Sequence, residues 1–294
     1  MSEPPFGGET LRQRALKGSL YLAIRRIVGI VLSLLGLLLI VRPVGPDSYG
    51  IYNAAVAITG YLQIIGNTGA RMYLIRLPEL PPRKLLDSVF WWLMFVGTAL
   101  SFLAVPVVLL VGYYWMQDAG FVPVAITLCV MTPLGLITAI PTALLERALE
   151  YKRTAWVELF SQLGFYVVGI PLALMGYGAW ALVGGHGLSL LIALVGFYVS
   201  ASYVPKWCWD RAQLRDMGRY IAAQTTATWI YELRQLAPPM LLLPLAGASA
   251  VGYLAIANRL LDILSFAQTA VQRVSAPVYA HVQKDRAKLM EAIY

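Results

Sequence analysis

The strongest constraint on this chain is a series of eight apolar stretches, each about as long as a helix that crosses a lipid bilayer. Such a helix needs about 20 mostly apolar residues to cross about 30 Å of hydrocarbon. The eight stretches cover residues 18–41, 49–65, 89–111, 120–145, 156–175, 179–199, 220–245 and 251–274. Stretches of this length cross a bilayer as helices, because a helix satisfies its own backbone hydrogen bonds. The pattern predicts an all-α, polytopic membrane helix bundle of about eight spans.

The composition excludes the main soluble classes of protein. Of the 294 residues, 59% are hydrophobic and only 13% are charged. Soluble domains carry about 25% charged residues, so this chain lacks the polar groups that would cover a water-facing surface. Disordered chains are poor in apolar residues, and this chain is rich in them. A soluble enzyme and a disordered protein are therefore both excluded.

The basic residues fall almost entirely on one side of the predicted spans. Seventeen of the 23 Lys and Arg residues lie in segments on the same side as the amino terminus, and only Arg42 lies in an opposite loop. Cytoplasmic loops collect Lys and Arg, so this bias predicts a membrane protein with both termini in the cytoplasm. It also explains the net charge of +8 without a nucleic-acid partner. The predicted segments are a cytoplasmic amino-terminal segment (1–17), a first transmembrane lobe of six spans (18–200), a basic cytoplasmic linker (201–219), spans seven and eight (220–281) and a cytoplasmic tail (282–294).

The sequence contains no motif of an enzyme or of a metal site. It has no Walker loop, no HExxH pair and no nucleophile elbow. Its two cysteines, Cys129 and Cys208, are far apart and form no CxxC pattern. The predicted loops are too short to hold a soluble catalytic domain. We expect no enzymatic activity, no cofactor and no bound metal.

Several loops resemble those of a known transporter family. The segment 45–52, which reads GPDSYGIY, is similar to the G-P-x-x-Y-G-x-Y turn of bacterial polysaccharide transporters. These belong to the multidrug/oligosaccharidyl-lipid/polysaccharide exporter superfamily. Four further stretches resemble the family in the same order: Pro141 with 147–153, then 176–182, then 251–259, and Pro277 followed by Asp285.

The resemblance implies both an architecture and a substrate. The resemblance implies the family's architecture, which is two six-helix lobes around a central cavity. This chain would correspond to the first lobe and two helices of the second. The implied function is flipping of undecaprenyl-pyrophosphate-linked oligosaccharide across the bacterial inner (cytoplasmic) membrane for polysaccharide synthesis. The implied partners are the lipid-linked oligosaccharide, membrane lipids and polysaccharide polymerase or assembly proteins. Two alternatives stay open: a cation-coupled multidrug exporter of the same superfamily, or a non-transporting scaffold or incomplete gene product.

Charged residues inside the predicted spans are the first candidates for substrate contacts. Each costs about 2.5 to 3.5 kcal/mol in lipid, so it faces a cavity, a partner or the interface. In span one we expect Arg25 to reach back to the headgroups and Arg26 to line a cavity. In span eight, Arg259, Asp262 and Arg273 fall within about 60° on one helical face. Arg26, Arg259 and Arg273 are the candidate pyrophosphate contacts, and Asp262 is a candidate for ion coupling.

Polar residues in spans six and seven are further candidates. A stripe of polar side chains in span seven lies within about 100° of the helical wheel. It favours a wet cavity over helix packing alone, and its members are Gln224, Thr228, Tyr231, Glu232 and Gln235. His186 in span six is either a proton-coupling group or a hydrogen-bonded residue of a glycine-rich helix. At the cytoplasmic ends of spans four and five, acidic residues lie among basic ones and predict a solvated ion-pair face; they are Glu146, Glu150 and Glu158.

Overall fold

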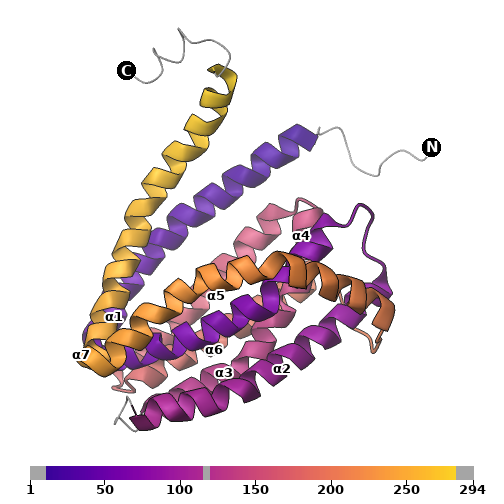
Figure 1. Cartoon of the computed structure of the whole chain (residues 1–294). Helices are drawn as coiled ribbons and strands as arrows, with labels where there is room; N and C mark the ends of the chain where they lie inside the picture. The colour runs from indigo at the N-terminus through magenta and orange to yellow at the C-terminus, as the bar shows by residue number, and fades with distance from the viewer. Residues whose placement is uncertain (1–10, 115–119, 283–294) are drawn as a thin grey trace, which may run out of the picture. The chain divides into compact units, whose positions relative to one another are not determined.

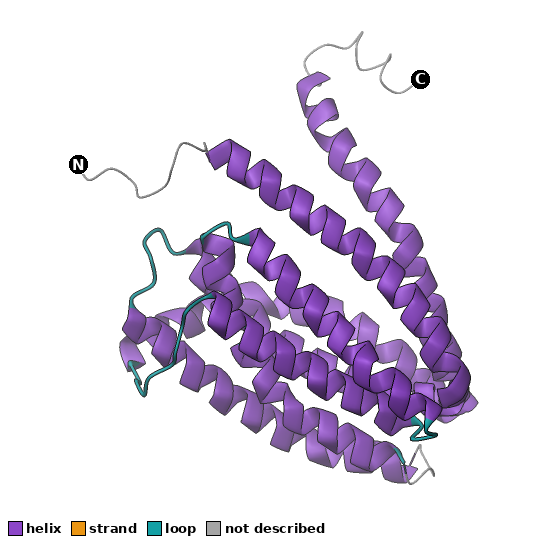
Figure 2. Ribbon diagram, turned by 180° about the vertical axis from the view of Figure 1, so that it is seen from behind, coloured by secondary structure: helices purple, strands orange, loops and turns teal. Residues whose placement is uncertain are grey.

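The computed structural model describes residues 11–114 and 120–282, with side chains left out at 11–20, 22–23, 68, 222–227, 235 and 262–282. The described residues form seven α-helices and no strand (Figure 2). The helices are α1 (Leu11–Arg76), α2 (Arg83–Tyr114), α3 (Phe121–Ile137), α4 (Ala139–Arg147), α5 (Tyr151–Leu174), α6 (Ala179–Ser200) and α7 (Arg211–Val282). Six helical segments in the described residues are long and apolar enough to cross a membrane. The predicted all-α, polytopic fold is confirmed.

Two helices are bent at a glycine, and each bend separates two predicted spans. α1 turns at Gly45, with φ 77° and ψ 161°, and α7 turns at Gly247, with φ 81° and ψ 178°. A positive φ is strained for residues that carry a Cβ atom, so glycine permits each turn. Figure 1 shows the two arms of α1, residues 11–44 and 46–76, running in different directions from the bend. The sequence predicts two separate spans here, and the structure joins them within one helical run.

Glycine also lets the two bends approach each other closely. A Cβ atom on Gly50 would lie 1.8 Å from the carbonyl oxygen of Ala248, and one on Gly252 would lie 2.3 Å from that of Pro46. The contact is reciprocal, because each glycine lies one turn beyond its own bend and meets the backbone of the other. A side chain at either position would push the two backbones apart.

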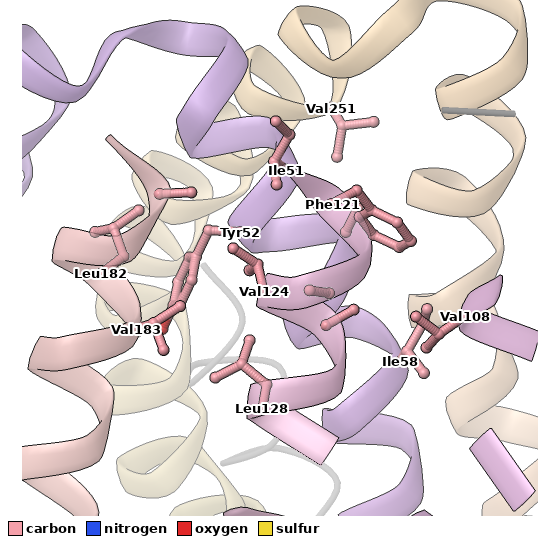
Figure 3. Packing of buried hydrophobic residues seen from close by; sticks show 14 of the residues in the cluster. Ile51, Tyr52, Ile58, Val108, Phe121, Val124, Leu128, Leu182, Val183 and Val251 are labelled. Carbon is pink, nitrogen blue, oxygen red and sulfur yellow. The ribbon is translucent and has the colours of Figure 1, made fainter. Parts of the chain in front are cut away.

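Two large clusters of buried apolar side chains, and a third of only three residues, hold the bundle together. The first surrounds the bends and includes Ile51, Phe121, Leu182 and Val251 (Figure 3). The second lies at the other end of the helices, and its fully buried members include Leu74, Leu93, Leu136 and Met217. Residues of α7 before its bend belong to both clusters. The chain accordingly divides into one compact unit that runs to Gly252 and another from Tyr253 onward.

Large apolar side chains also cover the outside of the helices. On α2, Phe95, Phe102 and Leu103 are 67%, 73% and 69% exposed. On α5, Val167 is exposed to a similar extent. A water-soluble protein would not expose so many in one band, but lipid tails solvate them. The exposed surface therefore agrees with a bundle that lies in a bilayer.

The first arm of α1 lies along α5, and the two segments run in the same direction. The side-chain amide of Gln162 donates a hydrogen bond to the carbonyl oxygen of Gly29 at 2.8 Å. Farther along, a Cβ atom on Gly36 would lie 1.9 Å from the ring of Tyr166. The contact at Gly36 needs a residue without a side chain, so this glycine sets how closely the arm approaches α5.

Arg147, at the carboxyl end of α4, caps the end of α1. Its guanidinium donates hydrogen bonds of 2.7 to 2.9 Å to four backbone oxygens. The acceptors are the carbonyls of Leu74, Ile75, Leu77 and Glu79. The last carbonyls of a helix have no partner within the helix, and a cation there also offsets the helix dipole. Arg147 is one of the basic residues beside the predicted ion-pair face of Glu146, Glu150 and Glu158, but its guanidinium binds backbone carbonyls.

The linker between α6 and α7 is fastened to α2 by Asp87, a buried carboxylate. The Tyr203 hydroxyl and the Lys206 backbone N–H donate to Asp87 Oδ1 at 2.8 and 3.1 Å. Burial, and then the hydrogen bond to Asp87, raise the pKa of Tyr203, so the phenol stays protonated and remains a donor. Trp91 adds a hydrogen bond from its indole to the carbonyl of Lys206 at 3.1 Å. The start of the predicted basic linker thus has a fixed path on α2.

Candidate functional site

The candidate site begins with an ion pair between α1 and α5. Nε of Arg25 lies 2.9 Å from Oε2 of Glu158, and the two side chains are 27% and 33% exposed. Glu158 lies about 24 Å along α5 from the end of that helix at Leu174, at 1.5 Å per residue. Because the hydrocarbon layer is about 30 Å thick, the pair lies close to one boundary of the membrane. Arg25 is thus paired with a carboxylate, where the sequence predicts a side chain directed only at headgroups.

A second ion pair lies beside the first. The guanidinium of Arg71, on the second arm of α1, contacts the carboxylate of Glu146 on α4 through both Nε and Nη2. Arg71 and Glu146 also act electrostatically on Glu158. We call Arg25, Glu158, Arg71 and Glu146 the charge cluster. It joins both arms of α1 to α4 and α5, and its two positive and two negative charges balance.

Arg26 adds a positive charge next to this balanced cluster. Its side chain is exposed. Among the side chains that the structure describes, no carboxylate lies within ion-pair distance of it. Arg26 therefore supplies an excess positive charge one residue from the charge cluster. The prediction that it lines a cavity remains a prediction.

The polar stripe of α7 is described in part. Thr228 and Glu232 are partly buried, whereas Tyr231 is exposed and stacks with Arg234, whose Cζ lies 3.9 Å from the ring centroid. Tyr231 is a member of the predicted stripe. The side chains of Gln224 and Gln235 lie outside those that the structure describes. The role of the stripe as a cavity wall remains a prediction.

The candidates beyond the bend of α7 belong to the second compact unit. Arg259 is exposed and makes interactions within the structure. The side chains of Asp262 and Arg273 lie outside those that the structure describes. The predicted Arg259–Asp262 pair and the shared face with Arg273 therefore stay predictions.

His186 lies in a closely packed part of α6. Its neighbours Gly185 and Gly187 face Phe165 of α5 and Met131 of α3, at distances where an added Cβ atom would crowd both. The His186 side chain is itself partly buried. This packing agrees with a glycine-rich helix contact, and proton coupling by His186 stays a prediction. In the part of the chain whose side chains are described, no group of three His, Cys, Asp or Glu residues could hold a metal ion.

Sequence reasoning missed how the charged residues pair. Glu158 is 133 residues from Arg25, and Glu146 is 75 residues from Arg71, so no local spacing connects them. Asp87 shows the same limit, since its partner Tyr203 lies 116 residues away. The available signal was the presence of an acid inside or beside an apolar stretch, which requires some partner but does not identify it.

Comparison with known proteins identifies the family. The sequence matches the family described as "Polysaccharide biosynthesis protein" over residues 39–294. It is 23% identical over 261 residues to the succinoglycan biosynthesis transport protein ExoT of Rhizobium meliloti (strain 1021), and the match covers 87% of this chain and 51% of that protein. The chain thus spans about half the length of this relative. No solved structure matches the sequence. Since the family match covers most of a chain whose helices have membrane-spanning length, the chain belongs to the polysaccharide biosynthesis protein family, as its resemblance to polysaccharide transporters predicts.

Proposed function

We propose that the protein is a transporter that flips a lipid-linked oligosaccharide across the bacterial inner membrane during polysaccharide synthesis. The family match and the name of the Rhizobium relative support a role in polysaccharide transport. The predicted lipid carrier is undecaprenyl pyrophosphate. The observation that carries the proposal is the excess positive charge of Arg26, which lies at a membrane boundary beside the charge cluster.

A cation at this boundary suits the chemistry of the substrate. A pyrophosphate that links a lipid to a sugar carries two negative charges, and it loses hydration when it enters a cavity of low dielectric. A guanidinium replaces that hydration with two parallel, charge-assisted hydrogen bonds. In this proposal Arg26 receives the headgroup, and Arg259 and Arg273 contact it at a later stage of transport.

The polar stripe of α7 suits the sugar portion. Hydroxyl, amide and carboxylate side chains exchange hydrogen bonds with sugar hydroxyls, so they replace water without a large net cost. In this proposal the contacts come from Gln224, Thr228, Glu232 and Gln235. Asp262 and His186 are the proposed coupling groups outside the charge cluster.

The pairing of the acids favours an anionic substrate over a cationic drug. A cation exporter needs a carboxylate in the membrane that is available to a positive ligand. The described acids of the charge cluster, Glu146 and Glu158, are each occupied by an arginine. The excess charge beside them is positive, and it would repel a cation.

Complementation of a bacterial strain that lacks its oligosaccharide flippase tests the proposal. The wild-type chain is expected to restore surface polysaccharide, and Arg26→Ala is expected to lower the transport rate about ten- to hundredfold, the effect of one lost charge-assisted hydrogen bond. Arg26→Lys keeps the charge and is expected to retain part of the activity. The matched control is Arg42→Ala, which removes an exposed arginine near the other end of the same arm. Full activity of Arg26→Ala, or an equal loss in Arg42→Ala, contradicts the role of Arg26.

A further inference from the structure

The Arg25–Glu158 pair leaves most of the arginine available. The contact recorded with Glu158 joins Nε and Oε2 at 2.9 Å. No side chain or backbone group that the structure describes accepts a hydrogen bond from Nη1 or Nη2 of Arg25. A guanidinium can donate five hydrogen bonds in a fixed fork, and Nη1 and Nη2 form its outer edge. Arg25 can therefore bind a second anion, or exchange the Glu158 carboxylate for another anion.

The position of the pair suits a lipid phosphate. The pair lies near one membrane boundary, and its side chains are 27% and 33% exposed, so a ligand at that boundary can reach them. The basic residues of the neighbouring segments place this boundary on the predicted cytoplasmic side. Phospholipid and lipid-carrier phosphates lie at this depth. Arg26, the next residue, adds the second positive charge that a diphosphate requires.

We propose that Glu158 occupies Arg25 in the empty protein, that a phosphate of a lipid headgroup replaces it, and that Glu158 then takes up one proton. This inference rests on the proposed function, because it concerns the same substrate. The exchange consumes one proton from the cytoplasm and converts the carboxylate to a carboxylic acid. Release of the headgroup reverses both changes.

The surroundings of Glu158 explain why it would be protonated once Arg25 is lost. The charged groups that face it from other helices are Arg25 and Arg71 of α1 and Glu146 of α4. Arg71 is already bound to Glu146, whose carboxylate repels that of Glu158. On the other side, α6 carries no charged residue, and His186 is its one titratable group besides tyrosine. A half-buried carboxylate beside a second carboxylate and a diphosphate has too little positive charge to stay ionised.

Binding of a defined probe at several pH values tests the exchange. The probe is a short-chain prenyl diphosphate that carries one sugar, because its charge stays constant across the neutral range. The full chain in phosphatidylcholine nanodiscs is expected to bind it more tightly as the pH falls, by up to about tenfold per pH unit where Glu158 titrates. Glu158→Gln is expected to bind more tightly than wild type, with no pH dependence. Arg25→Ala is expected to lose at least about tenfold in affinity.

Controls separate this inference from the function and identify the source of the phosphate. Glu150→Gln changes an exposed acid that precedes α5 and pairs with Arg153 of that helix at 3.7 Å, and it is expected to behave as wild type. Probe binding that is independent of pH and unchanged in Glu158→Gln overturns the exchange but leaves the transport proposal intact. Absence of binding at every pH overturns both. If Glu158→Gln does not fold, probe binding by wild type and Arg25→Lys tests the exchange instead. The exchange requires that both proteins bind the probe more tightly as the pH falls. Replacing phosphatidylcholine with phosphatidylglycerol shows whether a bulk phospholipid competes for Arg25.

Discussion

At the scale of single residues, Arg147 shows how one side chain can complete the end of a helix. Four backbone oxygens, two in the last turn of α1 and two just beyond it, accept hydrogen bonds from its guanidinium. Arg153 offers a matched comparison, because it is also basic, lies nearby in sequence, and donates to one carbonyl, that of Ser200, at 3.0 Å. The difference in the number of acceptors predicts a difference in stability.

Arg147→Ala is expected to destabilise the protein by about 2 to 4 kcal/mol, because it leaves several helix-end carbonyls without a donor. Arg153→Ala is expected to cost less than about 1 kcal/mol. Thermal unfolding of the detergent-solubilised protein measures both. Equal midpoints for the two variants would show that the capping bonds do not stabilise the fold. Arg147→Lys is expected to fall in between, since an ammonium cannot span the four acceptors.

The candidate site divides at this scale into what the sequence predicts and what it does not. Arg26 could be singled out because a charge in an apolar stretch is costly wherever the chain folds. The partner of Arg25 could not, because the pair forms only after α1 and α5 pack together. Glycines show the same limit. Gly36 meets the ring of Tyr166, whereas Gly60 faces open space, and their local sequences do not distinguish them.

At the scale of elements, apolar length predicts the helices well and their ends less well. Seven of the eight predicted stretches each lie in one helical run to within a residue, because about 20 apolar residues can satisfy their backbone in lipid only as a helix. The stretch 120–145 is divided between α3 and α4 at Thr138. The bends are different. The sequence predicts a turn between 41 and 49, but the backbone stays helical on both sides of Gly45. Residue propensities cannot distinguish a loop from a helix that bends at one glycine with positive φ, because the same residue types favour both.

The linker that follows α6 gives a prediction at this scale. Asp87→Ala removes the acceptor for Tyr203 and Lys206, so the linker is expected to open more often. Cys208 lies in this linker and is partly buried, so it serves as the reporter. Its rate of alkylation by a maleimide is expected to rise about tenfold, which corresponds to about 1.4 kcal/mol of lost docking energy.

Two internal controls accompany this experiment. Cys129 is buried among apolar side chains, so it is expected to stay unlabelled in both proteins. Asp216→Ala removes an exposed acid from the first turns of α7 and is expected to leave the Cys208 rate unchanged. Unchanged Cys208 labelling in Asp87→Ala would show that the carboxylate does not hold the linker.

At the scale of the whole molecule, the distribution of basic residues predicts an orientation in the membrane. Cys208 lies in a segment expected to face the cytoplasm, and the exposed Tyr177 lies in a turn expected to face outward. In intact cells whose outer membrane has been made permeable, an impermeant maleimide is expected to label Tyr177→Cys and to leave Cys208 unlabelled. Cys208 is expected to react only after the inner membrane is opened. The reverse pattern would invert the predicted topology, and the boundary that holds the charge cluster would then face outward.

The contact between the two bends has a consequence for how such a bundle can be controlled. Where Gly50 meets Ala248 and Gly252 meets Pro46, main chain rests on main chain, and neither glycine brings a group that can titrate. A change in pH or in salt concentration is therefore expected to have little direct effect on these backbone contacts. A change of charge in the charge cluster, at the opposite end of the helices, can therefore reach these contacts only by moving the helices that carry them.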